Sequence, residues 1–350
     1  MKRVEAKILN ELAFSKRTVW ELLDKCNCSL KDFASALKRL YAGGFITSDE
    51  KGFYITAKGK KEINPKSLNF GGKICPFCFG KRIIPEAKFK EILSEFKRIT
   101  AKRPQPTVDF FQGYMLEESV VARAALMHYY GDLDRKSIVL VGDDDLLSIA
   151  LALTELPSSI FVLDVDTRIG EFIKNFKREY GYAIDFMKYN VSDPLPRELQ
   201  GKFDVFSSEP LETSSGLKAF IIRGTACLKE NGVGYFGLTN YEASLKKWLA
   251  VQKFLSRMNC VITDIIQGFS VYPMTYDTAD YEKFVYNLGF DIGKNPGINW
   301  YKSALIRFEI IGKARLPAIS GKKLKVNLID KNEDLTHPIL HHEIIKELGA

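Results

Sequence analysis

Residues 137–145 read Ser-Ile-Val-Leu-Val-Gly-Asp-Asp-Asp, and this stretch decides the fold. An apolar run rich in Ile and Val is followed directly by a glycine and three acidic residues. A short apolar run that ends at a glycine is typical of a strand buried on both faces in a parallel sheet. We therefore expect a strand at 137–141 and a ligand-binding loop at 142–145, because ligands of such sheets bind at the carboxyl ends of the strands.

Strands and helices alternate on both sides of this stretch. Helices are expected at 115–130, 146–156, 168–180 and 215–228, and strands at 160–164, 184–187, 203–206 and 234–239. Such alternation predicts a parallel sheet covered on both faces. The expected fold class is α/β: a Rossmann-like (methyltransferase-like), doubly wound sheet over residues 107–320, to which 261–267 and 305–311 add strands.

Residues 1–66 form a separate winged-helix-like domain. Helices are expected at 4–14, at 19–23 behind Thr18 and after Ser29, followed by strands at 45–47 and 53–56. In a winged helix-turn-helix domain the third of these helices can enter a DNA groove. Here that helix carries only Lys31, Lys38 and Arg39 as basic residues. We therefore favour a packing or dimerisation module and do not expect nucleic-acid binding.

Residues 67–106 form a connector, and residues 321–350 a tail that we expect to be mobile. The connector contains Cys75 and Cys78 in the order Cys-Pro-Phe-Cys and an amphipathic helix expected at 86–99. A Cys-x-x-Cys pair is half of a four-thiolate zinc site, and two ordinary thiols in a tight turn are the other interpretation. His337, His341 and Glu343 of the tail could likewise bind a metal, although a solvated tail is favoured.

The composition narrows the class of protein. The 350 residues are 46% hydrophobic, which is normal for a globular protein. No stretch of about 20 residues is free of charge, and no apolar signal core follows Met1, so we expect a cytoplasmic protein and no membrane span. The formal charge of +8 would suit nucleic acid, but Lys-, Glu- and Ile-rich sequences are also common in thermophiles.

Acidic residues follow the second and third expected strands as well. Asp164 ends the second strand, about 20 residues after Gly142, and Asp166 lies close behind it. An acid at this spacing hydrogen-bonds a ribose in nucleoside-binding folds. Asp193 follows the third strand. A nucleoside is therefore the expected ligand of this edge.

The loop at 142–145 excludes phosphate-bearing ligands. It lacks the Gly-x-Gly-x-x-Gly pattern that lets backbone amides approach a pyrophosphate. Clustered carboxylates repel phosphate, at about 4 kcal/mol per close pair of charges at an effective dielectric constant of 20. The cationic sulfonium of S-adenosylmethionine fits better, but its carboxylate would be repelled too. Decarboxylated S-adenosylmethionine has no anion and fits best, while a calcium or magnesium site is the alternative.

A fourth acidic segment follows the fourth strand, at the position where amino-group methyltransferases hold their acceptor amine. It contains Glu209 and Glu212, which could bracket an ammonium group. A solvated turn is the other interpretation.

Three segments together resemble one family. Residues 139–145 (Val-Leu-Val-Gly-Asp-Asp-Asp), 232–239 (Gly-Val-Gly-Tyr-Phe-Gly-Leu-Thr) and 111–114 (Phe-Gln-Gly-Tyr) are similar to the branched-chain polyamine synthases, N(4)-bis(aminopropyl)spermidine synthases, of thermophilic archaea and bacteria. The order of domains is similar as well. The resemblance implies aminopropyl transfer from decarboxylated S-adenosylmethionine to spermidine and to its N(4)-aminopropyl derivative. Methylthioadenosine is the by-product, no cofactor is required, and the protein is expected to form a homodimer.

The resemblance also assigns roles to residues. It makes Asp144 the catalytic carboxylate, which accepts the proton of the attacking amine. The residues expected to bind the donor are Gly142, Asp143, Asp145, Asp164, Asp166, Asp193 and Gln112, and those expected to bind the acceptor are Glu209, Glu212, Tyr114 and Tyr241. Two departures concern the acceptor: Glu209-Pro210-Leu211 replaces an expected Asp-Pro-Pro, and Phe111 replaces an acid before Gln112.

Two other functions fit parts of the pattern. One is an S-adenosylmethionine-dependent N-methyltransferase, which would need a site for the donor carboxylate. The other is a winged-helix regulator with a ligand-sensing domain. The choice between a tertiary and a quaternary amine product stays open.

Overall fold

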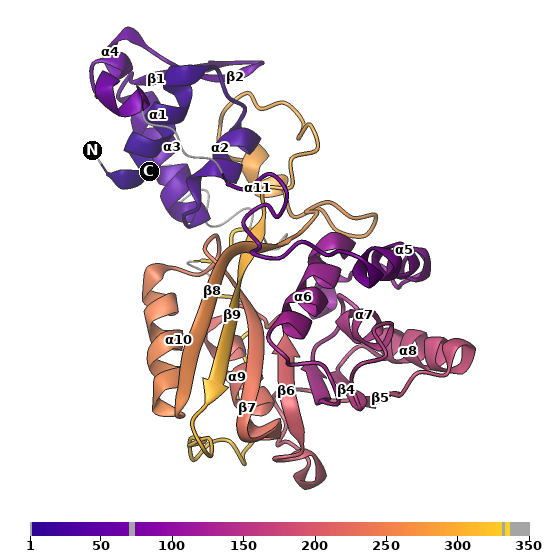
Figure 1. Ribbon diagram of the computed structural model, residues 1–350. Helices are drawn as coiled ribbons and strands as arrows, with labels where there is room; N and C mark the ends of the chain where they lie inside the picture. The colour runs from indigo at the N-terminus through magenta and orange to yellow at the C-terminus, as the bar shows by residue number, and fades with distance from the viewer. Residues whose placement is uncertain (1, 70–73, 331–332, 337–350) are drawn as a thin grey trace.

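The computed structural model describes residues 2–69, 74–330 and 333–336, in an N-terminal domain, a connector and a larger α/β domain (Figure 1). The N-terminal domain lies beyond one end of the sheet of the α/β domain (Figure 1). Its elements are α1 (Arg3–Phe14), α2 (Val19–Cys26), α3 (Leu30–Ala42), β1 (Ile46–Asp49), β2 (Gly52–Ile55) and α4 (Ala57–Lys60). The expected winged-helix order is confirmed, and Thr18 and Ser29 cap α2 and α3 through hydrogen bonds from Glu21 N and Asp32 N.

The connector ends in α5 (Lys88–Thr100), which matches the expected amphipathic helix. Its apolar face, with Ile92, Phe96 and Ile99, is buried. α5 packs against α6 (Glu117–Tyr129) and α7 (Leu147–Ala152). This helix therefore belongs to the α/β domain in space, although it precedes the domain in the sequence.

Seven strands form the sheet, in the order β5-β4-β3-β6-β7-β9-β8. They are β3 (Ser137–Val141), β4 (Ser159–Asp164), β5 (Ile184–Lys188), β6 (Phe203–Ser208), β7 (Leu228–Thr239), β8 (Cys260–Val271) and β9 (Lys302–Ile310). The first five in the sequence are parallel, as expected, whereas β9 is antiparallel to both β7 and β8. The sheet is therefore mixed, and β3 lies near its centre.

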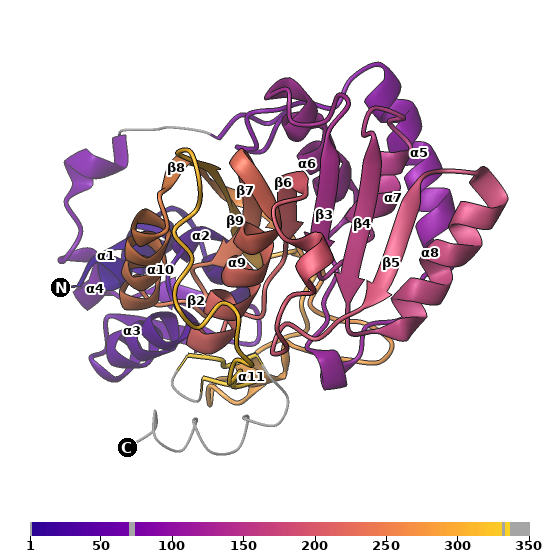
Figure 2. The same cartoon turned by 90° about the horizontal axis from the view of Figure 1, so that it is seen from below.

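Helices cover both faces of the sheet (Figure 2). Besides α6 and α7 they are α8 (Thr167–Tyr180), α9 (Ser214–Cys227) and α10 (Leu245–Arg257). The short α11 (Lys283–Tyr286) lies away from these faces, next to α2 of the N-terminal domain (Figure 1). Alternate residues of β3 enter two different cores: Ile138 and Leu140 pack on the side of α6, α7 and α8, and Val139 and Val141 on the side of α9 and α10. Helix α10 was not expected from the sequence. No described helix is long and apolar enough to span a membrane.

The insertion between β8 and β9, residues 272–301, contacts the N-terminal domain. Trp20 donates a hydrogen bond from Nε1 to the carbonyl of Gly293 (3.0 Å). Phe290 packs edge-on against Tyr41 and Phe53. The winged-helix-like domain thus supports this insertion.

Part of the tail that we expect to be mobile, residues 321–330 and 333–336 and here called the strap, makes contacts with the α/β domain. Leu324 N donates to the Ser192 carbonyl (2.7 Å), and Thr213 Oγ1 donates to the Asn327 carbonyl (2.7 Å). Leu335 and Thr336 are buried. The strap therefore packs on the α/β domain, through contacts that its Lys-rich composition did not indicate.

Candidate active site

The Gly142 loop lies at the carboxyl end of β3, where a parallel sheet places its ligands. Gly142 has a φ of 79°, in the left-handed region that a glycine adopts without strain. Its N–H donates to the carbonyl of Leu163 (2.8 Å) in β4. The glycine therefore turns the chain sharply across the edge of the sheet and presents the three aspartates that follow.

The three aspartates point in different directions. Asp143 is buried and accepts hydrogen bonds from the backbone and side chain of Ser148 in α7. Asp145 is also buried and accepts from Met115 N (2.5 Å). Asp144 is only partly buried and accepts a long bond from Gly113 N (3.3 Å). Two of the carboxylates thus shape the loop, and Asp144 is the most accessible.

Burial raises the pKa of Asp144 to about 7, and the charges of Asp164 and Glu209 raise it as well. Burial also raises the pKa values of Asp143 and Asp145 well above the ordinary range. A carboxylate with a pKa near 7 is a suitable proton acceptor at neutral pH. The loop therefore has the properties of a general-base site.

Gln112, Asp164 and Asp166 form one rim of the site. Asp164 accepts hydrogen bonds from Asp143 N and Asp166 N (both 2.8 Å), and Gln112 Nε2 donates to Asp166 (2.9 Å). Burial raises the pKa of Asp164. Burial alone would also raise the pKa of Asp166, but hydrogen bonds from Arg168 and Gln112 outweigh it and lower that pKa.

Asp193 is not brought to this rim. It is exposed, lies beyond edge strand β5, and forms a long ion pair with Lys323 (3.7 Å).

Glu209, at the carboxyl end of β6, is held by a buried cation. Arg123 of α6 is 1% exposed and pairs with Glu209 Oε1, and Tyr272 donates to Glu209 Oε2 (2.5 Å). Gly237 of β7 makes room for the carboxylate, since a Cβ atom there would lie 1.9 Å from Glu209 Oε2. The glycine of the Tyr-Phe-Gly-Leu-Thr motif thus leaves the space that the Glu209 side chain occupies.

A pocket of about 140 Å³ opens beside Glu212, and we call it the acidic pocket. Its lining contains three carboxylates and several aromatic rings: Phe111, Leu211, Glu212, Thr213, Glu242, Tyr281, Tyr301, Leu328, Asp334 and Thr336. Glu212 Oε1 accepts from Thr239 N (2.6 Å), whereas its buried Oε2 has no hydrogen-bond partner among the described residues. Burial raises the pKa of Glu212 well above the ordinary range and that of Asp334 to about 7. The pocket therefore suits an ammonium group.

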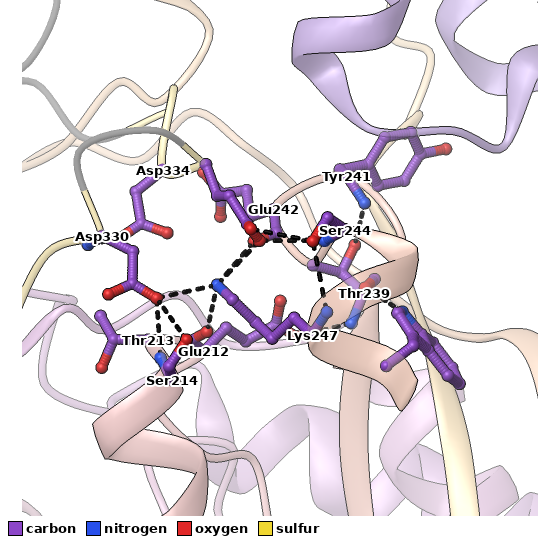
Figure 3. A network of polar contacts seen from close by, with 12 residues as sticks. Glu212, Thr213, Ser214, Thr239, Tyr241, Glu242, Ser244, Lys247, Asp330 and Asp334 are labelled. Atoms are coloured by element: carbon purple, nitrogen blue, oxygen red, sulfur yellow. Dashed lines mark hydrogen bonds and ion pairs between the residues drawn. The ribbon is translucent and has the colours of Figure 1, made fainter. Parts of the chain in front are cut away.

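Lys247 of α10 lies behind the wall of this pocket (Figure 3). Its Nζ donates to the backbone carbonyls of Glu212 (2.8 Å) and Glu242 (3.1 Å). It also pairs with Asp330 and Glu333 of the strap, both at 3.1 Å. The hydrogen bonds and ion pairs of the Lys247 ammonium are thus made with backbone carbonyls and with the strap, and not with the carboxylates that line the pocket. Lys247 fixes the pocket wall. Glu242 accepts hydrogen bonds from Tyr301 and Thr336, so the buried carboxylate oxygen of the lining that lacks a partner among the described residues is Oε2 of Glu212.

Tyr114 and Tyr241 differ in their placement. Tyr114 packs against Tyr276 of the insertion, with ring centroids 4.9 Å apart. The hydroxyl of Tyr276 donates a hydrogen bond to the backbone carbonyl of Tyr114 (3.0 Å). Tyr241 is buried against Trp300 and Tyr301, and its hydroxyl donates to Leu23 O in the N-terminal domain (3.4 Å). Tyr241 supports the pocket wall and does not line the acidic pocket.

Sequence reasoning missed Glu242, Asp334 and the tyrosines of the insertion. Glu242 and Asp334 lie in turns without a recognisable motif. Glu242 is a single acid among uncharged neighbours, and the acids at 330, 333 and 334 were the only signal for Asp334. Tyr281 donates its hydroxyl to Gln112 O (2.7 Å). The insertion thus closes the site from a part of the chain far away in sequence.

The described residues contain no group of three or more His, Cys, Asp or Glu side chains that could hold a metal ion. This includes the surroundings of Cys75 and Cys78 within one chain and the aspartates of the 142–145 loop. His337, His341 and Glu343 lie outside the described residues.

Carboxylates outnumber cations throughout the site. The carboxylates of the site belong to Asp144, Asp164, Glu212, Glu242 and Asp334. The two nearby cations are already paired: Arg123 binds Glu209, and Lys247 binds the strap. An excess of buried carboxylates attracts cations and excludes phosphates. The arrangement can therefore bind a nucleoside sulfonium and a polyamine side by side.

Comparison with known proteins gives one family. Residues 91–334 match the model of the branched-chain polyamine synthase A C-terminal domain. The N(4)-bis(aminopropyl)spermidine synthases of Thermococcus kodakarensis and Methanocaldococcus jannaschii are 37% and 35% identical to this chain, over 84% and 85% of it and 84% of each relative. A crystal structure of a branched-chain polyamine synthase C9 mutein from Thermus thermophilus, in complex with N4-aminopropylspermidine and 5'-methylthioadenosine, has a TM-score of 0.84 and 32% identity, and the match covers 95% of this chain and 93% of that one. The chain, with its acidic loop at the carboxyl end of β3, belongs to the branched-chain polyamine synthase family.

Proposed function

We propose that this protein is an aminopropyltransferase. It moves the aminopropyl group of decarboxylated S-adenosylmethionine to the central secondary amine of spermidine, and then to the same nitrogen again, and releases methylthioadenosine. The observation that carries the proposal is the acidic pocket, which lies beside a loop whose accessible carboxylate, Asp144, has a pKa of about 7. The names of the relatives and the ligands of the Thermus structure support it.

The donor is assigned to the rim formed by Gln112, Asp164 and Asp166. Asp164 is placed to accept hydrogen bonds from the ribose, as acids do at this point of nucleoside-binding sheets. The sulfonium then lies over the 142–145 loop. A donor carboxylate would need a free cation there, and the buried guanidinium of Arg123 is already bound to Glu209. Intact S-adenosylmethionine, the donor of a methyltransferase, is disfavoured for this reason.

The acceptor is assigned to the acidic pocket. Glu212, Glu242 and Asp334 hold a terminal ammonium, and the rings of Tyr281 and Tyr301 pack against the alkyl chain. The unpartnered Oε2 of Glu212 gains a hydrogen bond when the ammonium binds. Anchoring one end of spermidine in this way leaves its central nitrogen near the loop.

The reaction is a displacement at carbon. Asp144 accepts the proton of the secondary ammonium, which frees the lone pair of the nitrogen. This pair forms the new C–N bond while the C–S bond breaks, and its electrons stay on sulfur as a neutral thioether. The leaving group therefore needs no acid. Positioning of the two cations by fixed carboxylates supplies the rest of the acceleration.

Two further statements complete the proposal. The protein acts in the cytoplasm, and it acts as a homodimer. Both agree with the small diffusible substrates and with the domain order, and neither is needed for the chemistry of a single active site.

The test compares Asp144→Asn with the wild type, using labelled decarboxylated donor and spermidine. We expect kcat to fall by a factor of about 100 or more, because proton acceptance is lost while the shape is kept. Asp185→Asn, at an exposed ion pair on the edge strand, serves as the control and should keep full activity. Turnover of Asp144→Asn at the wild-type rate would contradict the assigned role.

A further inference from the structure

The acidic pocket is too small for a whole polyamine. Its volume is about 140 Å³. A cavity of about 150 Å³ in another protein holds one benzene molecule, which has six carbon atoms. An aminopropyl arm has four non-hydrogen atoms and an aminobutyl arm has five, so either arm fits, whereas the whole of spermidine does not. The pocket therefore takes one arm of the acceptor, and its walls limit the length of that arm.

The charged part of the lining accounts for the end of such an arm. A primary ammonium has three hydrogen-bond donors. Glu212 offers its unpartnered Oε2, and the carboxylates of Glu242 and Asp334 lie in the same lining. The methylenes behind the ammonium need apolar contacts, and the lining supplies them through Phe111, Leu211, Tyr281, Tyr301 and Leu328. Since the carboxylates fix the ammonium, the apolar wall decides how many methylenes fit behind it.

Phe111 is the aromatic ring of this wall that has no polar group. The hydroxyl groups of the other two rings are used elsewhere: Tyr281 donates to Gln112 O (2.7 Å), and Tyr301 donates to Glu242 Oε2 (2.8 Å). The residue that follows Phe111 in the chain is Gln112, whose Nε2 donates to Asp166 of the donor rim (2.9 Å). Phe111 therefore lies where the acidic pocket meets the donor rim.

The backbone holds the Phe111 ring in a fixed place. Phe111 has a φ of 56° and a ψ of 37°, in the left-handed region that is unfavourable for a bulky residue. The turn is closed by bonds from Phe111 N to Val108 O and from Gln112 N to Thr107 O, both 3.2 Å long. Strain of this kind persists where the surrounding structure fixes it, and it is concentrated at ligand sites. The ring cannot move aside for a longer arm without breaking these bonds.

We infer that Phe111 is a specificity-determining residue. Its ring closes the acidic pocket and restricts the acceptor to secondary amines that carry a primary ammonium at the end of an arm of three or four methylenes. The inference rests on the proposed function, because it takes the acidic pocket as the acceptor site. One methylene too many or too few in an apolar pocket changes discrimination by roughly 10- to 200-fold. An aminohexyl arm, with seven non-hydrogen atoms, is therefore excluded.

The experiment uses the full chain and symmetrical triamines. In each triamine the secondary nitrogen carries two identical arms of three, four or six methylenes that end in a primary amine, so neither arm offers an alternative length. The kcat/KM for aminopropyl transfer from decarboxylated S-adenosylmethionine and the Kd from calorimetry are measured for each. We expect the wild type to favour the arms of three and four methylenes over the arm of six by about 100-fold or more in both quantities.

Phe111→Ala removes a ring of the size of benzene and thereby about doubles the space for the arm. We expect the preference against the arm of six methylenes to fall at least tenfold, chiefly because this triamine binds more tightly. Phe111→Leu removes less volume and should give an intermediate preference, and it serves as the test if Phe111→Ala does not fold. Phe110→Ala is the matched control: this neighbouring ring is 42% exposed, and the described lining of the pocket does not include it.

The outcomes separate this inference from the proposed function. An unchanged arm-length preference in a folded Phe111→Ala or Phe111→Leu variant would overturn the inference, and so would a wild type that binds the longest triamine as tightly as the shortest. Aminopropyl transfer with either of these results would leave the proposed function intact. Binding that depends on arm length and on Phe111, without any transfer, would support the role of Phe111 and contradict the proposed reaction.

Discussion

Gly237 is the residue that lets this chain use a glutamate where a shorter acid is expected. Because Gly237 has no side chain, Glu209 Oε2 occupies the space that a Cβ atom would take. Arg123 and Tyr272 then hold both oxygens of the carboxylate. Since Glu209 is neutralised in this way, its effect on the acceptor operates through the shape and the field of the site.

We expect Gly237→Ala to displace the Glu209 carboxylate. The new methyl group would overlap Oε2, and over-packing of this kind costs about 1–3 kcal/mol of unfolding free energy. Loss of the Arg123 partner should reduce kcat/KM for spermidine at least tenfold. Chemical denaturation and steady-state kinetics measure the two effects. Gly321→Ala, where a Cβ atom would meet nothing within 4 Å, should change neither quantity.

Asp144 links stability to pH. Its pKa is raised to about 7 in the folded protein, above the value near 3.8 of the unfolded chain. The folded state therefore binds the proton more tightly, and this group becomes increasingly destabilising as the pH rises from about 4 to about 7. Asp144→Asn removes the charge. We expect the variant to melt at a higher temperature than the wild type at pH 8, and the difference to shrink toward pH 4.

The activity should rise with pH, whereas the contribution of Asp144 to stability falls. The base form of Asp144 is required, so kcat/KM for spermidine should fall as the pH decreases through about 7. A profile that is flat between pH 6 and pH 8 would contradict the role of this carboxylate as the proton acceptor.

At the scale of elements, the parallel half of the sheet could be predicted from sequence because its strands and helices alternate locally. The acids at the strand ends were found for the same reason, and Asp144, Asp164 and Asp166 do meet at one rim. Strands at 261–267 and 305–311 were expected, but their antiparallel pairing and the insertion between them depend on long-range contacts. Helix α10 was missed although Ser244 caps it and one of its faces is apolar, so its signal was local. Glu242, Asp334 and Tyr281 escaped notice because they reach the pocket from turns that have no local signature.

The strap shows how one side chain organises such turns. Asp330 accepts from Ser214 N at the start of α9 (2.7 Å), and Glu333 accepts from Ser244 N at the start of α10 (2.9 Å). Carboxylates are favourable at helix N-termini. Lys247 lies between the two acids and completes the attachment.

We expect Lys247→Met to release the strap. Two partly buried carboxylates, those of Asp330 and Glu333, would lose their cation, and Asp334 and Thr336 would lose their place in the acidic pocket. The KM for spermidine should rise about tenfold or more, with little change in the KM for the donor. Hydrogen exchange of residues 327–336 should become faster. Lys218→Met, at an exposed lysine of α9, is the control; a rise in both KM values by the same factor would point to general unfolding instead.

At the scale of the whole molecule, the N-terminal domain acts as a support of the active site. It contacts the insertion through Trp20 and through Phe290, and Lys302 pairs with Asp24 of α2. The same insertion supplies Tyr276 and Tyr281, which bind the backbone of Tyr114 and Gln112. The winged-helix-like domain therefore packs against the insertion that carries these tyrosines.

We expect Phe290→Ala to weaken this support. The substitution removes a ring that packs on Tyr41 and Phe53, and losses of about 3–5 kcal/mol are typical for fully buried rings. Because Phe290 is only partly buried, the loss should be smaller, but hydrogen exchange across 272–301 should increase and the KM for spermidine should rise. Tyr54→Ala, at an exposed wing residue, should leave both unchanged.

The unpartnered oxygen of Glu212 has a consequence for how the protein behaves in a cell. Burial raises the pKa values of Glu212 and Asp334 in the acidic pocket, and an arriving polyamine favours the ionised forms of these two carboxyl groups. Each polyamine molecule that binds therefore causes these carboxyl groups to release protons, and its positive charge offsets the repulsion between them. The polyamine pool then acts as a thermal protectant of the enzyme that enlarges it, and a fall in that pool would leave the folded chain more exposed to heat.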